Sequence, residues 1–407
     1  MEEKITVEKI SEPSITAVPG IGAAALNCGL KKAKDDLALV CSETDAAAAG
    51  VFTRNLVQAA PVILCREAVD SPVRALVLNS GNANACTGEQ GMNNARKMAS
   101  LAAAALGVSP EQVLVSSTGV IGQQLPMEKV AAGIERAAAQ VSPDAAAGRR
   151  AAGAILTTDK VTKEVAYRGY AGGKPFHLAG MAKGSGMICP DMATMLAFLF
   201  TDLAVERALL QKLLQEAVER SFNLITVDGD TSTNDTVLLL ANGAAGLPEV
   251  AGGSALCRVF AEMLGEACCD LARQIVADGE GVTKVITLTL EGAPDRASAR
   301  TLARAVLNSP LVKTAFYGED ANWGRIIAAL GYAGVEFDPG KVDIFLGPLQ
   351  VARQGEAVPF SESEASAVLQ QKEIAVRVEL GAGPCSLTAW GSDLSHEYIS
   401  INSNYRS

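Results

Sequence analysis

The residues around Thr194 have the types and spacing needed for acyl-transfer chemistry. The run Lys183-Gly-Ser-Gly-Met-Ile-Cys-Pro-Asp-Met-Ala-Thr194 is rich in glycine, contains a proline, and leads into the apolar stretch Met195–Phe200. A peptide bond held on such a loop can be strained, and a threonine hydroxyl lies beside the carbonyl group that precedes it. The chain could therefore cut itself before Thr194, and the released α-amine would serve as base for the hydroxyl. In an arbitrary chain, an Ala–Thr step entering a buried strand would be the simpler interpretation.

Three other loops are dense in polar residues, and such loops commonly carry function. Asn79-Ser-Gly-Asn-Ala-Asn84 contains turn residues and fits a structural Asx-turn as well as a site. Ser116-Ser-Thr118-Gly119 places a hydroxyl beside a glycine N–H, a pair that could stabilise an oxyanion, although such turns are common. The segment Thr226–Asp235 is acidic but lacks the spacing and closing glutamate of a calcium loop. We expect it to be a hydrogen-bonded structural loop.

Histidine and cysteine contribute little to the predicted chemistry. His177 and His396 are the two histidines, and neither lies near a set of metal-type ligands in the sequence. Each is therefore expected to be structural, and a reaction that needs no histidine is favoured. The nine cysteines are scattered, without a Cys-x-x-Cys pair. This pattern predicts reduced thiols in the cytoplasm and argues against a metal site such as structural zinc.

Length and composition limit the class of protein. The 407 residues predict two domains or large lobes, and 49% hydrophobic with 20% charged residues indicates a globular chain. The net charge of −10 argues against a nucleic-acid partner, which would need a basic face. The start of the chain does not resemble a signal peptide, and no apolar run is long enough to span a bilayer. We therefore expect a cytoplasmic protein without a membrane partner.

The apolar pattern predicts strands that alternate with helices, hence a mixed α/β class. Strands are expected at Leu37–Cys41, Pro61–Leu64, Ala75–Leu78, Val113–Val115, Val285–Leu290 and Ile374–Leu380, and helices at Gly91–Leu106, Met127–Ala139, Glu206–Phe222 and Cys257–Ala277. Composition favours loops at Ser142–Arg150 and Gly246–Ser254.

The segment Gly20-Ile-Gly-Ala-Ala-Ala25 offers a competing hypothesis, because it matches the dinucleotide fingerprint Gly-x-Gly-x-x-Ala. The acidic residues Asp35 and Asp36 precede the next predicted strand, whereas a ribose-binding carboxylate should follow it. A non-enzymatic dinucleotide-binding module is kept as an alternative, and a nucleotide titration would test it.

Six segments together resemble the ornithine acetyltransferase (glutamate N-acetyltransferase) family. They follow the family's order across essentially the whole chain: Asn79–Gly88, Ser117–Gly122, Lys183–Leu196, Asp228–Thr236, Asp278–Lys284 and Gly318–Arg325. Two places depart from the family pattern. Asp191 stands where asparagine is expected, and the tail Asn402-Ser-Asn-Tyr-Arg-Ser407 differs from the commoner Asn-Ala-Asp-Tyr-x-Thr. The first affects the expected rate of cleavage, and the second affects the fit of the substrate.

The resemblance implies a role for each matching residue. Cleavage between Ala193 and Thr194 would make Thr194 the nucleophile, while the Thr118 side chain and the Gly119 N–H would form the oxyanion hole. The substrate contacts would be Thr157, Lys183, Thr194, Glu280, Asn402 and Ser407. A cation such as Lys183 suits a substrate carboxylate, and a carboxylate such as Glu280 suits the amine of ornithine.

The resemblance also implies the reaction and the architecture. An acetyl group would pass from N-acetylornithine to glutamate through acetyl-threonine, an acyltransferase step of arginine biosynthesis that needs no cofactor. Acetyl-CoA is left open as a co-substrate. The fold would be a two-lobed α/β sandwich of the ornithine acetyltransferase and N-terminal-nucleophile aminopeptidase type. Residues 1–193 would form an α chain and 194–407 a β chain, in an α₂β₂ heterotetramer. The alternative enzyme is an N-terminal-nucleophile amidase or aminopeptidase, which would hydrolyse acyl-Thr194.

Overall fold

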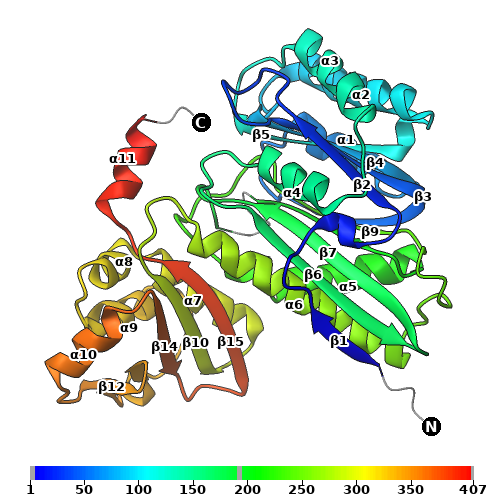
Figure 1. Cartoon of the computed structure of the whole chain (residues 1–407). Coiled ribbons are helices and arrows are strands. Elements are labelled where there is room, and N and C mark those ends of the chain that lie inside the picture. Colours follow the sequence, from blue (N-terminus) through cyan, green and yellow to red (C-terminus); the bar gives the residue numbers. More distant parts are fainter. Residues whose placement is uncertain (1–4, 190–194, 405–407) are drawn as a thin grey trace.

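Two β-sheets organise the chain into a larger and a smaller lobe (Figure 1). The computed structural model describes residues 5–189 and 195–404. Within these residues, one sheet has nine strands and the other has six, and helices cover both. The expected mixed α/β class is thereby confirmed.

The larger lobe occupies about the first two thirds of the chain and is built on the larger sheet. Its spatial order is β1 (Thr6–Lys9), β6 (Lys163–Ala171), β7 (Lys174–Lys183), β8 (Leu196–Thr201), β9 (Thr236–Ala241), β3 (Leu37–Phe52), β4 (Val73–Asn82) and β5 (Val113–Val120), with β2 (Ile21–Leu26) also paired to β3. The helices of this lobe are α1 (Ala60–Ala68), α2 (Gly88–Leu106), α3 (Met127–Ala138), α4 (Ala145–Ala154), α5 (Arg207–Glu219) and α6 (Ala255–Ala277).

The smaller lobe is built on the remaining strands. Their order is β13 (Glu356–Ala357), β12 (Leu349–Arg353), β11 (Asp343–Leu346), β14 (Glu373–Glu379), β10 (Val285–Ala293) and β15 (Cys385–Ser392). Its helices are α7 (Arg296–Asn308), α8 (Pro310–Tyr317), α9 (Trp323–Gly331) and α10 (Glu362–Leu369), and α11 (His396–Asn404) leaves β15 and extends away from the lobe (Figure 1). Short 3₁₀ turns lie at Ile15–Ala17, Pro110–Gln112, Phe222–Leu224 and Pro339–Lys341.

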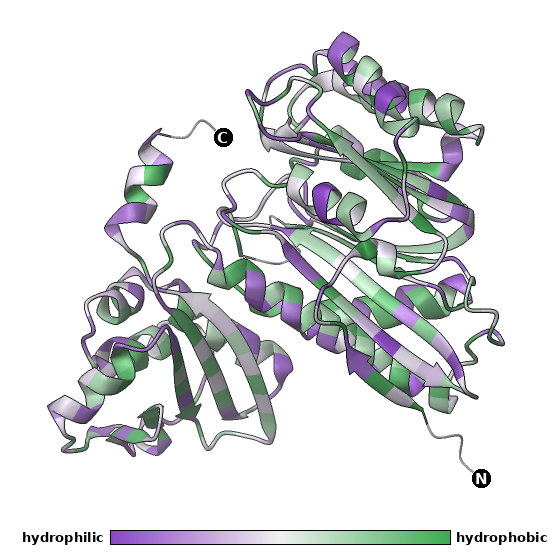
Figure 2. Cartoon of the chain, viewed as in Figure 1, coloured by the Kyte–Doolittle hydropathy of each residue, from purple (hydrophilic) through white to green (hydrophobic). Residues whose placement is uncertain are grey.

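The long strand β3 folds the large sheet into two layers. Residues Leu37–Cys41 pair with β4, the register shifts, and Ala47–Phe52 pair with β9. One apolar core lies between the layers, a second lies between β6–β9 and the helices α5 and α6, and a third lies beneath α2 and α3. Figure 2 shows these strands as largely hydrophobic, whereas the helices carry hydrophilic residues along their outer sides. The result is a helix–sheet–sheet–helix sandwich, as expected.

The proposed cleavage point falls, along the sequence, in the segment that connects two neighbouring strands. β7 and β8 are antiparallel, with Lys183 opposite Leu196. β8 then runs parallel to β9, with Leu196 opposite Thr236. Strands from residues 1–193 therefore flank strands from residues 194–407 on both sides within one sheet. A cut between β7 and β8 would leave the main-chain ladder and the core intact.

Two predicted elements are wrong. Pro61–Leu64 was expected to be a strand but lies in α1, where the proline occupies the first turn. A proline is tolerated there because the first N–H groups of a helix have no partner in the helix. Ser142–Arg150 was expected to be a loop, but α4 begins at Ala145. Gly148 lets this helix approach Ser14, because a Cβ at Gly148 would lie 2.1 Å from the Ser14 hydroxyl oxygen.

The dinucleotide hypothesis for Gly20–Ala25 is also wrong. Most of the segment lies in β2, where Ile21 faces Ser42 of β3. The fingerprint requires a tight turn from a strand into a helix, and a strand interior cannot supply it. The nearby Asp36 is buried and accepts hydrogen bonds from backbone N–H groups, including those of Cys28 and Leu30, both at 2.7 Å. It therefore has a structural role.

Candidate active site

A cavity of about 230 Å³ opens where the ends of several strands converge. Its wall comes from the carboxyl ends of β5 and β7, the segment after α4, the loop before β9, the segment after α6, and α11. The strand register explains part of this convergence. The end of β7 and the starts of β8 and β9 meet at one edge, since Lys183 faces Leu196 and Leu196 faces Thr236.

Thr118 and Gly119 lie in β5, at the wall of the cavity. Thr118 is buried except for this face. Gly119 has φ +133°, and its backbone passes so close to β4 that a Cβ would lie 2.5 Å from the Asn82 nitrogen. Only glycine fits at this position. The Thr118 hydroxyl and the Gly119 backbone thus both lie at the cavity, as the proposed oxyanion hole requires.

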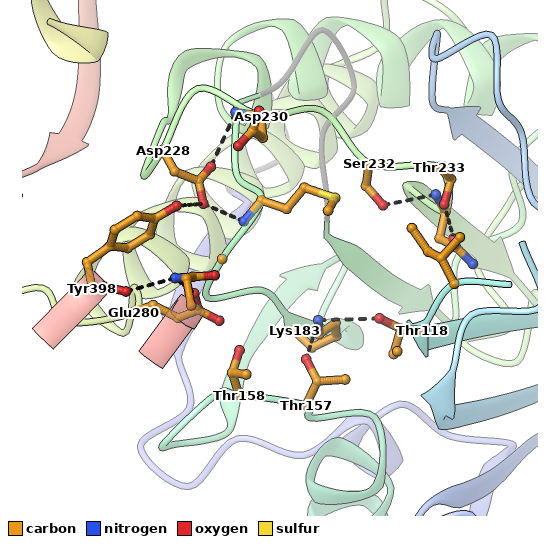
Figure 3. Close-up of a pocket in the computed structure, with 16 residues that line it drawn as sticks. Thr118, Thr157, Thr158, Lys183, Asp228, Asp230, Ser232, Thr233, Glu280 and Tyr398 are labelled. Atoms are coloured by element: carbon orange, nitrogen blue, oxygen red, sulfur yellow. Dashed lines mark hydrogen bonds between the residues drawn. The ribbon is translucent and has the colours of Figure 1, made fainter. Parts of the chain in front are cut away.

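Lys183 lies between Thr118 and Thr157 (Figure 3). Its ammonium group donates to the Thr157 hydroxyl at 2.9 Å and to the Thr118 hydroxyl at 3.4 Å. Burial lowers the pKa of Lys183, and the Asp159 carboxylate, 3.9 Å away, partly offsets that effect. The cavity therefore has the buried side-chain nitrogen of Lys183 directly beside the candidate oxyanion donors.

Asp159 connects the residues around Lys183 through hydrogen bonds. It accepts hydrogen bonds from the Thr157 and Gly184 backbone N–H groups at 3.0 and 2.7 Å and from the Lys163 ammonium at 2.8 Å. Burial would raise the pKa of Asp159, but Lys183 and Lys163 outweigh it and hold the pKa below its usual range. Asp159 is therefore ionised at neutral pH. Sequence reasoning missed this residue, although it lies two positions after Thr157.

The opposite wall of the cavity is acidic. Glu280, almost fully buried, accepts a hydrogen bond from the Asn402 side chain at 2.8 Å. Asn402 and Tyr398 both come from α11, and the Tyr398 hydroxyl donates to Asp228 at 3.2 Å (Figure 3). The last helix of the chain thus contacts residues of the cavity wall.

The loop Thr226–Asp235 is hydrogen-bonded, as expected, and it also forms part of the cavity wall. Asp228, Asp230, Ser232, Thr233 and Asn234 all line the cavity. The loop does have a structural part as well, because Asp228 accepts the backbone N–H groups of residues 187 and 188 at 2.6 and 2.7 Å. The run of acidic and hydroxyl side chains directly before a buried strand was the signal that could have identified it.

The segment from Lys183 to Cys189 is held in an irregular conformation. Met187 has φ +57°, which is unfavourable for a side chain larger than glycine. The Asp228 carboxyl group fixes its N–H, and burial raises the pKa of Asp228. Thr231 holds the Cys189 carbonyl oxygen at 3.0 Å. The approach to the proposed cleavage point is therefore anchored to the loop before β9.

The structure brings the described candidates around one cavity. These are Thr118, Gly119, Thr157, Lys183, Glu280 and Asn402. Ala193, Thr194 and Ser407 lie outside the described residues, as does Asp191. Met195, which follows Thr194 in the sequence, is a buried residue whose N–H donates to the Asp235 carboxyl group at 2.9 Å.

The remaining polar candidates are structural. Asn79 donates to the Asn82 carbonyl oxygen at 2.9 Å and accepts from the Ser117 hydroxyl at 2.6 Å, so it supports β5. His177 pairs with Asp202 at 2.7 Å, as expected of a structural histidine. In the described part of the chain, no group of three His, Cys, Asp or Glu could hold a metal ion. Of the helices described there, none has the length and apolar character to cross a membrane.

Comparison with known proteins identifies the family. The ArgJ family model matches residues 22–407. The chain belongs to the ArgJ family. It is 54% identical over 396 residues to the arginine biosynthesis bifunctional protein ArgJ of Symbiobacterium thermophilum, covering 96% of this chain and 98% of that protein. It is 48% identical over 394 residues to the Thermotoga neapolitana protein of the same name, covering 95% and 98%. The family predicted from the six sequence segments is therefore confirmed.

A solved ArgJ structure supports the fold. The crystal structure of the arginine biosynthesis bifunctional protein from Bacillus halodurans is 42% identical, with a TM-score of 0.50. The match covers 51% of this chain and 98% of the solved chain. The solved chain is therefore about half as long as this chain.

Proposed function

We propose that this ArgJ family member moves an acetyl group from N-acetylornithine to glutamate through an acetylated Thr194. The protein is an acetyltransferase of arginine biosynthesis, in keeping with its family and its relatives. The observation that carries the proposed route is the meeting of Thr118, Gly119, Lys183 and Glu280 around one cavity. A hydroxyl, a glycine backbone, a cation and a carboxylate are the groups this route requires.

The reaction proceeds in two half-reactions, acetylation of Thr194 and transfer of the acetyl group to glutamate. The Thr194 hydroxyl attacks the acetyl carbonyl of N-acetylornithine, and the α-amine of Thr194 takes its proton. Thr118 and the Gly119 N–H stabilise the oxyanion, and ornithine leaves after its amine receives the proton. The glutamate amine then attacks acetyl-Thr194, and the same steps run in reverse. One amide is broken and one is formed, so the exchange needs no cofactor.

The charges around the cavity fit amino-acid substrates. Lys183 is placed to receive a carboxylate or the developing oxyanion, since it lies 3.4 Å from the Thr118 hydroxyl. Glu280, Asp228 and Asp230 line the other wall and suit the ammonium group of ornithine. A carboxylate at one end and an ammonium group at the other are what N-acetylornithine presents.

Thr194 becomes the nucleophile by cleavage of the bond to Ala193, which gives α chain 1–193 and β chain 194–407. Two observations support this step. Strands from both sides of the bond pair in one sheet, so the halves stay together after cleavage. The solved Bacillus halodurans chain matches only half of this chain. We propose an α₂β₂ assembly in the cytoplasm, and acetyl-CoA as a second donor to the same threonine, in keeping with the bifunctional name of the relatives.

The direct test uses purified protein with N-acetylornithine and glutamate. Ornithine and N-acetylglutamate should appear in equal amounts, and denaturing gels should show two bands, the second chain beginning at Thr194. Thr194→Ala should give one 42.1 kDa band without activity. An uncut protein that transfers acetyl groups would overturn the mechanism. Rapid hydrolysis of N-acetylornithine without an amine acceptor would instead favour the amidase alternative.

A further inference from the structure

Asp235 is a buried carboxyl group next to the cavity but outside its wall. One oxygen, Oδ1, accepts the Met195 N–H at 2.9 Å. The other, Oδ2, is also buried and makes no hydrogen bond within the described part of the chain. The neighbouring Thr53 hydroxyl is committed to the Ser232 carbonyl oxygen at 2.7 Å. A buried carboxyl group whose second oxygen has no hydrogen bond to any described residue is costly and calls for an explanation.

Asp235 holds the nitrogen of the peptide bond that joins Met195 to the proposed nucleophile, Thr194. The Met195 nitrogen is covalently bonded to the carbonyl carbon of Thr194. The Met195 carbonyl oxygen is also held, by the Thr236 N–H at 3.2 Å. Residues 235 and 236 therefore hold the N–H and the carbonyl oxygen of Met195, which can shift only if these bonds break.

Asn234, the residue before Asp235, holds the oxyanion side of the site. Its side-chain amide donates to the Ser117 carbonyl oxygen at 2.8 Å and to the Ala83 carbonyl oxygen at 2.6 Å. Ser117 directly precedes Thr118 in β5. Two consecutive side chains thus hold two different parts of the site, β5 through Asn234 and the start of β8 through Asp235.

We propose that Asp235 is a positioning residue for Thr194: it holds the Met195 amide while Asn234 holds β5, so the threonine and the oxyanion donors keep their register. This inference rests on the proposed function. The hold exists before cleavage and after it, because the Met195 N–H is not the bond that is cut. Asp235 thus serves both self-cleavage and acetyl transfer, and it does not bind the substrate.

The test compares Asp235→Ala, which removes the acceptor, with Asp235→Asn, which keeps an oxygen in the same place. Thr201→Val is the matched control, because it removes a buried hydrogen bond at the far end of β8, from the Thr201 hydroxyl to the His177 carbonyl oxygen (2.7 Å). Cleavage is measured on gels, and kcat and KM for N-acetylornithine are expressed per cut chain. Loss of register of about 1 Å can cost about 10²-fold in rate.

If Asp235 positions Thr194, the Asp235→Ala protein should cleave itself slowly or not at all. Any Asp235→Ala protein that is cut should have a kcat about 10²-fold lower than wild type, with KM within about twofold of wild type. Asp235→Asn should stay within about tenfold of wild-type kcat, and Thr201→Val should match wild type. An Asp235→Ala protein that remains uncut, with the Tm of Thr201→Val, also supports the proposal. If it equals Thr201→Val in cleavage and kcat, the proposal is overturned.

Two further outcomes keep the test decisive. If Asp235→Ala yields no folded protein, Asp235→Asn decides alone: kcat within about tenfold of wild type supports positioning, and a loss of 10²-fold or more with normal Tm contradicts it. The Thr194→Ala protein distinguishes a failure of the proposed function from a failure of the proposed role of Asp235. If that variant transfers acetyl groups, the proposed function fails whatever Asp235 does; if it is inactive, the Asp235 variants test positioning alone.

Discussion

Gly119 lies directly opposite Gly81 in the ladder between β5 and β4, and a Cβ on Gly119 would come within 2.4 Å of the Gly81 carbonyl carbon. The left-handed φ of +133° adds a second reason for glycine. We expect Gly119→Ala to push β5 away from β4, lowering Tm and reducing kcat by at least 10²-fold. Gly122→Ala is the matched control, since Gly122 also has positive φ but open space around it. Equal activity in the two variants would show that the Gly119 backbone is not needed in place.

The Thr118 hydroxyl should act mainly on the transition state. Thr118→Ala is expected to lower kcat by roughly 10²–10³-fold, the usual effect of removing one oxyanion donor. KM should change little, because the negative charge develops only as the acetyl carbonyl is attacked. Thr118→Ser keeps the hydroxyl and should recover most of the rate. Steady-state kinetics on cut protein tests this, and an Ala variant within a few-fold of wild type would make Thr118 a structural residue.

Activity should follow the ionisation of the Thr194 α-amine. Free α-amino groups titrate at about 7.7–8.0, and only the neutral amine can take the hydroxyl proton. The value of kcat/KM is therefore expected to climb as pH rises through this range. Carbamylation of the amine should abolish turnover. A pH profile that is flat from pH 6.5 to 9 would argue against the amine as the base.

Stability should also depend on pH, through Lys313. This lysine is buried and donates to the Ser392 carbonyl oxygen and hydroxyl. Burial lowers its pKa from 10.5 to about 8, despite the nearby Asp393 and Asp228. Below pH 8 both states hold the proton. Between pH 8 and 10.5 the unfolded state binds more protons, so folding is favoured as pH rises.

The gain between pH 7 and 9.5 is about 2 kcal/mol, or about 2 °C in Tm for a chain of this length. Lys313→Met removes the titrating group, so the Tm difference between wild type and this variant should shift in favour of wild type over that range. Lys372→Met changes an exposed lysine and is the control. A Tm difference for Lys313→Met that does not change with pH would contradict the effect.

The sequence predicted the parts of the site that lie close to a motif, and missed those that act across the fold. Periodicity identified β4, β5, α5 and α6, because each buries a regular apolar face. It failed at α1, where a short apolar run fits a helix or a strand equally well. Asp159 and Asp235 went unrecognised, since their partners Gly184 and Met195 lie 25 and 40 residues away in the chain. Such contacts depend on the register of the sheet, which one sequence does not reveal.

The end of the chain supplies the last prediction. Asn402 donates to Glu280 at 2.8 Å, and both residues line the cavity. Asn404 lies on the same helix, but among the described residues its side chain donates along the helix, to the Ser400 carbonyl oxygen at 2.8 Å. These two asparagines therefore form a matched pair for substitution.

Asn402→Ala should raise KM for N-acetylornithine about tenfold or more, since hydrogen bonds to charged groups are worth about 1.5–3 kcal/mol. Self-cleavage should be unaffected, because the hydrogen bonds that Asn402 makes to described residues go to Glu280 and to the Tyr398 carbonyl oxygen of α11. Asn404→Ala should behave as wild type in both assays. Deletion of residues 402–407 should also leave cut protein, with acetyl transfer sharply reduced. Full activity in that deletion would make α11 a terminal helix without a role in the site, whereas loss of cleavage would place the tail in the folding of the precursor.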